Sequence, residues 1–167
     1  MNKGKMIRLT DGTVIEAKMN FGTIYYLDQI GGSKLGRRID KLEKIGKATD
    51  SDKMNFAAKL IYAMVRSNGR KVTFDEALQL VPPDPTELLE VVEAYQKEVD
   101  KIKKKGGIES TDESIQLEIN WAEYMVDARE MGMTEDEFFH SCPVFFCEQY
   151  EIFCEKKARM VRTLYGG

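Results

Sequence analysis

The side chains best suited to chemistry lie near the C-terminus, where the one histidine of the chain stands close to its three cysteines. Zinc accepts one imidazole and three thiolates, so the number of ligands fits a structural site. The four residues are His140, Cys142, Cys147 and Cys154. Their spacing differs from that of short zinc knuckles, and Pro143 favours a helix start between the first two cysteines. Free cysteine also packs as a small apolar residue, so we favour packing over a zinc site or a Cys–His nucleophile.

Two groups of charged residues also have structural explanations. Asp136 and Glu137 stand at an expected helix start, where carboxylates stabilise the helix dipole. An expected helix over 34–45 carries a basic face that could meet phosphate, but Asp40 and Glu43 interrupt it, which is typical of a solvated surface. The basic residues are Lys34, Arg37, Arg38, Lys41 and Lys44. The sequence contains neither a glycine-rich phosphate loop nor a serine-nucleophile elbow, and we expect no catalysis, cofactor or metal.

The composition predicts a protein that folds around its own core inside the cell. Of the 167 residues, 43% are hydrophobic and 32% are charged, and a chain of this length needs no disulfide or metal to bury a core. The longest apolar run, Leu60 to Val65, is far shorter than the roughly 20 residues of a bilayer span. The N-terminus lacks a signal-peptide pattern. Without an export signal, the cysteines are expected to be reduced thiols in a cytoplasm.

The charge is divided unevenly along the chain. The net charge is −3, yet residues 1–105 sum to +5 and residues 106–167 to −8. The change coincides with a lysine run followed by Gly106-Gly107, which favours the end of a helix. We therefore predict an N-terminal domain over 1–105, a linker over 106–113 and a smaller C-terminal domain over 114–167.

Hydrophobic periodicity and capping signals predict a mainly α fold with one short N-terminal β-hairpin. The hairpin is expected over 6–17, because Asp11-Gly12 suits a tight turn. Thr73 with Glu76, and Thr134 with Glu137, form capping boxes that begin short helices. The other helices are expected over 23–30, 34–45, from 50 or 51 to 68, from Pro85 to the lysine run, from a capping box at Ser110 to Met131, and from Pro143 onward.

Two of the expected helices carry apolar surface that a partner could use. The helix after Pro85 has a seam with heptad-like spacing, formed by Leu88, Val92, Tyr95, Val99 and Ile102. This seam can pack within the domain or against a partner helix. The helix expected from Ser110 has two seams, and only about 60 residues remain to cover them, so part of that surface is expected to meet another molecule.

The segment from Trp121 to Phe138, followed by Cys142-Pro143, resembles the short C-terminal domain of the tail assembly chaperones of tailed phages. Those domains typically read Gly-Met-Thr/Ser, two further residues, Glu-Phe and then a Thr/Ser-Pro helix start. The matching residues are Gly132, Met133, Thr134, Glu137, Phe138 and Pro143, while Cys142 departs from the usual Ser or Thr. The N-terminal part, with its hairpin and the run Asn20 to Leu27, is similar to the companion domain in siphophages and prophages of Gram-positive hosts.

The resemblance implies a two-part protein produced by frameshifting, as in the lambda G and GT pair. There the short form is the first domain alone, and a programmed ribosomal frameshift appends the second. Lysine codons are rich in adenine, so the possible junction lies at Lys103, Lys104, Lys105 and Gly106. A polar helix end would look the same in the protein sequence.

The resemblance further implies a non-enzymatic chaperone of the host cytoplasm that is absent from the mature virion. It would shield the apolar seams of the tape-measure protein and recruit tail-tube subunits. The candidate tape-measure contacts are Leu88, Val92, Tyr95 and Val99. The candidate tail-tube contacts are Trp121, Tyr124, Met133, Phe138 and Phe139. Each of these residues is also suited to a core position.

Two other functions stay open from the sequence. The basic face near Arg37 would suit a small nucleic-acid-binding regulator, whose retention on DNA would depend strongly on salt. The histidine and cysteines would suit a zinc-stabilised adaptor, which a chelator would destabilise. Binding to a membrane is not expected, and self-association is possible.

Overall fold

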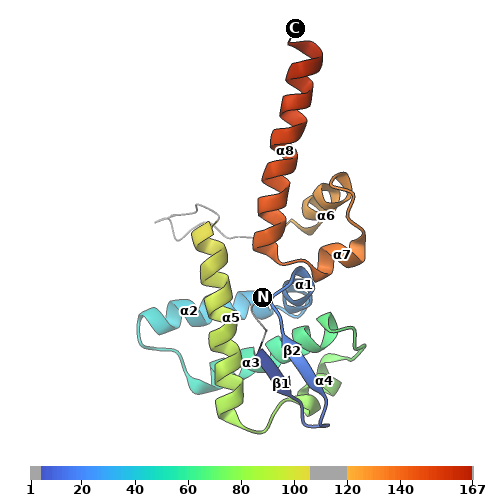
Figure 1. Cartoon of the computed structure of the whole chain (residues 1–167). Coiled ribbons are helices and arrows are strands. Elements are labelled where there is room, and N and C mark those ends of the chain that lie inside the picture. The colour runs from blue at the N-terminus through green and yellow to red at the C-terminus, as the bar shows by residue number, and fades with distance from the viewer. Residues whose placement is uncertain (1–4, 106–119, 167) are drawn as a thin grey trace. The chain divides into compact units, whose positions relative to one another are not determined.

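The computed structural model describes residues 5–105 and 120–166, which contain one two-stranded hairpin and eight helices (Figure 1). The prediction of a mainly α chain with a short N-terminal hairpin is confirmed. The chain divides into two compact units, Met1–Asp100 and Lys101–Gly167, and each is described by itself. The predicted linker over 106–113, with Gly106, lies outside the described residues.

The hairpin of the first unit is held by its turn. Strands β1 (Lys5–Arg8) and β2 (Val14–Ala17) are antiparallel and bring the buried Ile7 and Ile15 opposite each other. Gly12 has a φ of +83°, which glycine adopts without strain. The N–H of Thr13 donates to Asp11 at 2.9 Å, and Arg70 lies 2.6 Å from the same carboxylate. These two contacts, the Thr13 N–H first, lower the pKa of Asp11 to about 2.

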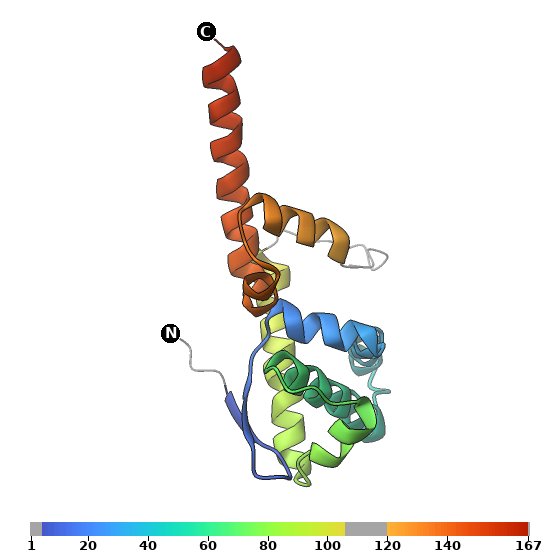
Figure 2. The ribbon, with the colours of Figure 1, turned by 90° about the vertical axis from the view of Figure 1, so that its right-hand side faces the viewer.

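Helix α3 (Asp50–Ser67) is the centre of the first unit, as Figure 2 shows from the side. Seven of its residues are buried: Phe56, Ala57, Leu60, Ile61, Ala63, Met64 and Val65. A helix that is apolar over most of its circumference must be covered on several sides. The cover is supplied by strand β2 and by helices α1 (Phe21–Gln29), α2 (Gly32–Lys44) and α4 (Phe74–Leu80).

A buried polar cluster joins the hairpin to α1 and α3. Thr23 is fully buried, and its hydroxyl lies within 3.0 Å of the side chain of Asn20, the carbonyl oxygen of Lys18 and the hydroxyl of Ser67. Asn20 also accepts the N–H of Thr23 at 2.8 Å and so caps α1. Buried polar groups are tolerated when their hydrogen bonds are satisfied, and these bonds fix the start of α1 against the end of α3.

Helix α5 (Pro85–Lys105) begins where the sequence predicts it. Asp84 accepts the N–H of Thr86 at 2.8 Å, which is the capping role expected before a first-turn proline. Leu88 and Val91 are buried in the core of the first unit. Lys5 of β1 and Glu90 form an ion pair, so the first turns of α5 contact both the hairpin and the core.

Beyond the end of α5, the described part of the second unit contains three helices: α6 (Trp121–Glu130), α7 (Glu135–His140) and α8 (Pro143–Tyr165). The capping boxes predicted at Thr73 and Thr134 are both present. The prediction of one helix running from Ser110 through Met131 is wrong at Asn120. Asn120 has non-helical dihedral angles, and its side chain accepts the N–H of Glu123 at 3.3 Å, so a helix begins at Trp121. The residues from 110 to 119 lie outside the described part.

Aromatic side chains form the core of the second unit. The rings of Phe138 and Phe146 are edge to face at 5.5 Å, and both side chains are buried. Tyr150 of α8 makes a side-chain hydrogen bond with Asp127 of α6, which is the main cause that raises the pKa of Tyr150 to about 12. Helix α8 continues beyond α6 and α7 (Figures 1 and 2), and every described residue from Cys154 onward is exposed.

We predict that Gly36→Ala destabilises the first unit although alanine favours helices. A Cβ atom at position 36 would lie 2.9 Å from Cε2 of the buried Phe56 ring. Overpacking costs about 1–3 kcal/mol, which exceeds the gain of at most about 1 kcal/mol in helix propensity. Urea unfolding should show a net loss of about 1 kcal/mol, while Lys41→Ala on the exposed face of α2 should change stability by less than about 0.5 kcal/mol. A Gly36→Ala variant more stable than the wild type would contradict this packing.

Candidate docking groove and aromatic cluster

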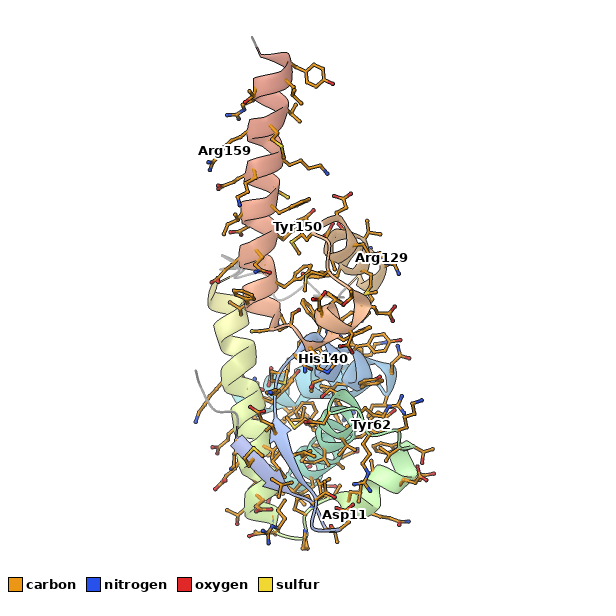
Figure 3. The ribbon with its side chains drawn as sticks, turned by 45° about the vertical axis from the view of Figure 1, so that its right-hand side comes forward. Asp11, Tyr62, Arg129, His140, Tyr150 and Arg159 are labelled. Carbon is orange, nitrogen blue, oxygen red and sulfur yellow. The ribbon has the colours of Figure 1, made fainter. Side chains whose placement is uncertain are left out.

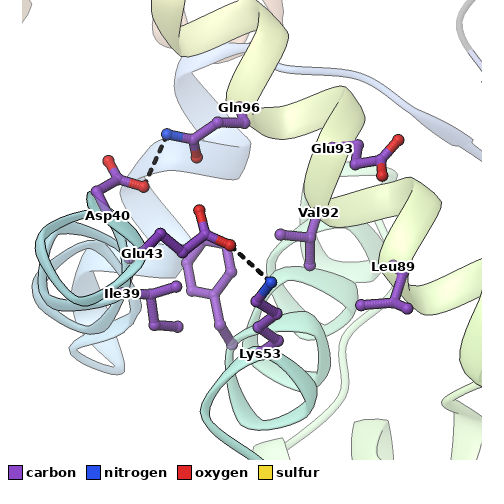
Figure 4. A pocket seen from close by; sticks show the side chains of 10 residues that line it. Ile39, Asp40, Glu43, Lys53, Leu89, Val92, Glu93 and Gln96 are labelled. Carbon is purple, nitrogen blue, oxygen red and sulfur yellow. Dashed lines mark hydrogen bonds and ion pairs between the residues drawn. The ribbon is translucent and has the colours of Figure 1, made fainter. Parts of the chain in front are cut away.

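A small groove opens in the first unit between α2, α3 and α5 (Figure 4). Its volume is about 230 Å³, and its apolar part is formed by Ile39, Phe56, Leu89 and Val92. Sites for drug-sized ligands are typically about 300–1,000 Å³. The groove is therefore better suited to one or two side chains of a protein partner than to a cofactor.

The polar edge of the groove is acidic. Three carboxylates, those of Asp40, Glu43 and Glu93, line it together with the single ammonium group of Lys53. Glu43 accepts a hydrogen bond from Lys53 at 2.7 Å and thereby raises the pKa of the lysine. Gln96 donates to Asp40 at 2.7 Å, which links α5 to α2 across the groove (Figure 4). The edge thus carries two more negative than positive charges, whereas the sequence of residues 1–105 sums to +5.

Phe56, which lines the groove, packs against Tyr95 of α5. Their rings meet edge to face with centroids 5.2 Å apart, which is a favourable aromatic geometry. Burial is the main cause that raises the pKa of Tyr95 to about 12, and the nearby charge of Asp40 adds to it. Tyr95 is therefore neutral at physiological pH, and it packs against the core of the first unit.

The predicted tape-measure contacts occupy different environments. Leu88 is 1% exposed and belongs to the core, whereas Val92 and Tyr95 are partly buried and pack against that core. Val92 also lines the groove. The side chain of Val99 lies outside the described part, as do those of Lys103, Lys104 and Lys105. The seam of α5 is thus largely used within its own unit, and its contact with a partner stays a prediction.

Leu89 is a groove residue that the heptad pattern missed. It lies beside the seam rather than on it, and its side chain is 40% exposed at the edge of the groove. A pattern of apolar spacing selects the face that packs on the core. The only sequence signal for Leu89 is that it is itself apolar and lies immediately next to that face.

The predicted tail-tube contacts surround the aromatic core of the second unit. Phe138 is fully buried, with its ring centroid 5.3 Å from that of Phe139. Tyr124 contacts Phe146 at 5.7 Å, and partial burial raises the pKa of Tyr124. Trp121, Tyr124, Met133 and Phe139 are partly exposed. Phe138 is therefore a core anchor, and the other four can be reached from solvent.

The histidine and cysteines are not gathered into a ligand set. In residues 5–105 and 120–166, no group of three or more His, Cys, Asp or Glu side chains is placed to hold a metal ion. His140 Nδ1 lies 2.8 Å from the carbonyl oxygen of Asp136. Partial desolvation and the charge of Glu151 raise the pKa of Cys147, which favours the thiol over the thiolate that binds metal or attacks a substrate.

The basic residues of α2 do not line the groove. Lys34, Arg38, Lys41 and Lys44 are exposed on the helix surface, and Arg37 is partly buried. Binding of nucleic acid by this face stays a prediction. None of the helices in the described ranges is both long and apolar enough to cross a membrane.

Comparisons with known proteins give no relative. No protein-family model, no curated protein and no solved structure matches the chain.

We predict that Tyr95 makes the first unit sensitive to alkaline pH. Its pKa is raised to about 12 in the folded chain, against an ordinary value of 10.0, so above pH 10 the unfolded chain releases the proton first. The stabilising contribution of the neutral phenol is thus complete below about pH 10 and is lost as the pH rises towards about 12. Tyr95→Phe should unfold at a higher pH than the wild type in a titration followed by circular dichroism, relative to Tyr62→Phe as a control for loss of a hydroxyl group. Equal alkaline midpoints for the Tyr95 variant and the wild type would contradict the prediction.

Proposed function

We propose that this chain is a tail assembly chaperone of a tailed phage, which binds and solubilises the tape-measure protein and recruits tail-tube subunits without catalysis. The observation that carries the proposal is the ordered motif Gly132-Met133-Thr134, Glu137-Phe138 and Pro143. Its residues have coherent structural roles, because Thr134 and Glu137 form the capping box of α7 while Phe138 anchors the core. Gly132 has a φ of +82°, which suits the glycine of the motif.

The groove of the first unit supports a role in holding the tape measure. A long helical protein exposes apolar side chains until the tail tube encloses it, and a groove with an apolar floor can receive such side chains. Leu89 and Val92 offer apolar contact, while the carboxylates at the edge keep the groove hydrated when it is empty. Binding of this kind needs neither a metal nor a covalent step.

The second unit supports a separate contact with tail-tube subunits. Its partly exposed aromatic residues are the type that contributes most to protein interfaces, and they lie around a rigid core at Phe138 and Phe146. Its sequence is acidic, unlike that of the first unit. We propose that the chain is the extended frameshift form, that it acts in the host cytoplasm, and that it leaves as the tube polymerises.

The groove is tested by co-expressing the tagged full chain with the tape-measure and tail-tube proteins of its phage. We predict that Leu89→Asp lowers capture of the tape measure at least about tenfold, because a charge would then have to be buried at the contact. Leu78→Asp on α4 is the matched control, since Leu78 is 43% exposed against 40% for Leu89 and does not line the groove. Circular dichroism should show that both variants are folded.

The outcomes of this experiment distinguish the chaperone function from the role of the groove. Failure of the wild-type chain to retain or solubilise either protein would reject the chaperone function. Equal capture of the tape measure by the Leu89 and Leu78 variants would keep the function and reject the groove.

A further inference from the structure

One face of α8 packs on the other helices of the second unit. Phe146 is buried on this face, and its ring meets that of Phe138 of α7 edge to face. Tyr150 lies on the same face and bonds Asp127 of α6. Figure 3 shows Tyr150 on the side of α8 towards α6, and Arg159 on the opposite side. These contacts define the covered face of the helix.

The same face continues along α8 beyond the end of α6. Its further positions are Phe153, Lys157, Met160 and Leu164. They follow Tyr150 at intervals of three or four residues, which keeps them on one side of a helix. Lys157 lies 3.1 Å from Glu130, the last residue of α6, whereas Met160 is 63% exposed and Leu164 is 75% exposed. Met160 and Leu164 therefore form an apolar ridge that the described part of the second unit leaves uncovered.

Positive charge surrounds this ridge. Residues 155–165 carry four basic side chains and one acidic side chain, which gives a net charge of +3. Two of the basic residues, Lys156 and Lys157, stand one turn before Met160, on either side of the ridge. Pairing with the same ridge of another copy would bring like charges together, which is unfavourable. The ridge therefore fits an apolar surface whose edge is negative.

The groove of the first unit is a surface of this kind. Its volume of about 230 Å³ suits one or two side chains, and its apolar part is formed by Ile39, Phe56, Leu89 and Val92. Carboxylates line its edge from two sides, two on α2 and one on α5, against the one ammonium group of Lys53 (Figure 4). The edge thus has a net charge of −2, opposite in sign to that of the ridge.

We propose that the ridge of Met160 and Leu164 docks in the groove of a second copy of this chain. The two side chains are four residues apart on one side of α8, so both can enter the groove together. Leu89 at the edge of the groove is 40% exposed, and the contact therefore removes apolar surface of both chains from water. The lysines one turn before Met160 then lie near the carboxylates of the edge, which favours this ridge over an uncharged helix.

The contact joins two different surfaces, so every chain offers one ridge and one groove. Such a contact either closes as a reciprocal pair or continues to further copies. The proposal uses the groove but does not depend on the chaperone function, because it concerns the chain alone. Since the tape measure is proposed to use the same groove, binding of the ridge and binding of the tape measure would exclude each other.

Self-association is tested with the full chain by sedimentation and light scattering over a concentration series under reducing conditions. The wild-type mass should rise above 19.1 kDa with concentration, and added salt should weaken the association because it screens the charges. Met160→Asp and Leu89→Asp should each weaken it at least about tenfold, because a charge would then be buried at the contact.

Each of these variants has a matched control that should associate as the wild type does. For Met160 the control is Ile152→Asp, since Ile152 is 54% exposed on the same helix but lies off the ridge. For Leu89 it is Leu78→Asp, since Leu78 is 43% exposed and does not line the groove. Equal helix content by circular dichroism would show that all four variants are folded.

A mixture of the two defective variants tests which surfaces meet. The Met160→Asp chain keeps an intact groove, and the Leu89→Asp chain keeps an intact ridge. Neither should capture a tagged copy of itself, whereas a tagged Leu89→Asp chain should capture the Met160→Asp chain, because one ridge and one groove remain between them.

A wild-type chain that stays monomeric at every concentration would overturn the proposal. So would association that either Met160→Asp or Leu89→Asp leaves unchanged, since another surface would then make the contact. Failure of the two variants to capture each other would show that the ridge does not bind the groove, even if each variant alone is monomeric.

Discussion

The ring of Phe56 sets the spacing of three helices in the first unit. It lies on α3, meets Tyr95 of α5 edge to face, and comes so close to α2 that only a glycine fits at position 36. The Phe56 ring thus packs directly against the backbone of α2, with no flexible side chain between them. This leaves little freedom for α2 to move towards α3. The same ring lines the groove, so a change that displaces Phe56 would alter both the stability of the unit and the shape of its candidate docking surface.

The two units bury their apolar side chains in different ways. The first surrounds one apolar helix, α3, with a hairpin and neighbouring helices, and its core is continuous. In the second unit, α6 has 10 residues and α7 has 6, against 23 in α8. Its aromatic core therefore occupies the first half of α8, and the second half is left with exposed apolar residues such as Met160 and Leu164.

Short-range chemistry made much of the fold predictable from the sequence. The Asp11-Gly12 turn and the capping boxes at Thr73 and Thr134 depend on residues at most three positions apart, and all three are present. The prediction failed at Asn120, because apolar periodicity continued through a residue whose side chain caps a helix. The groove could not be predicted from the sequence either. It depends on the close approach of Gly36 to Phe56 and on charges from three separate helices, and periodicity within one helix carries no information about such contacts.

The size of the groove has one mechanical consequence. A groove of about 230 Å³ takes only one or two side chains, so a single groove is expected to bind a helical partner weakly and to release it readily. Linkage of two weak sites raises the overall affinity by about 100- to 10,000-fold only when both can engage at once. Weak single contacts would therefore suit a chaperone that holds a long apolar chain through several copies and is released stepwise, as another protein displaces one groove at a time.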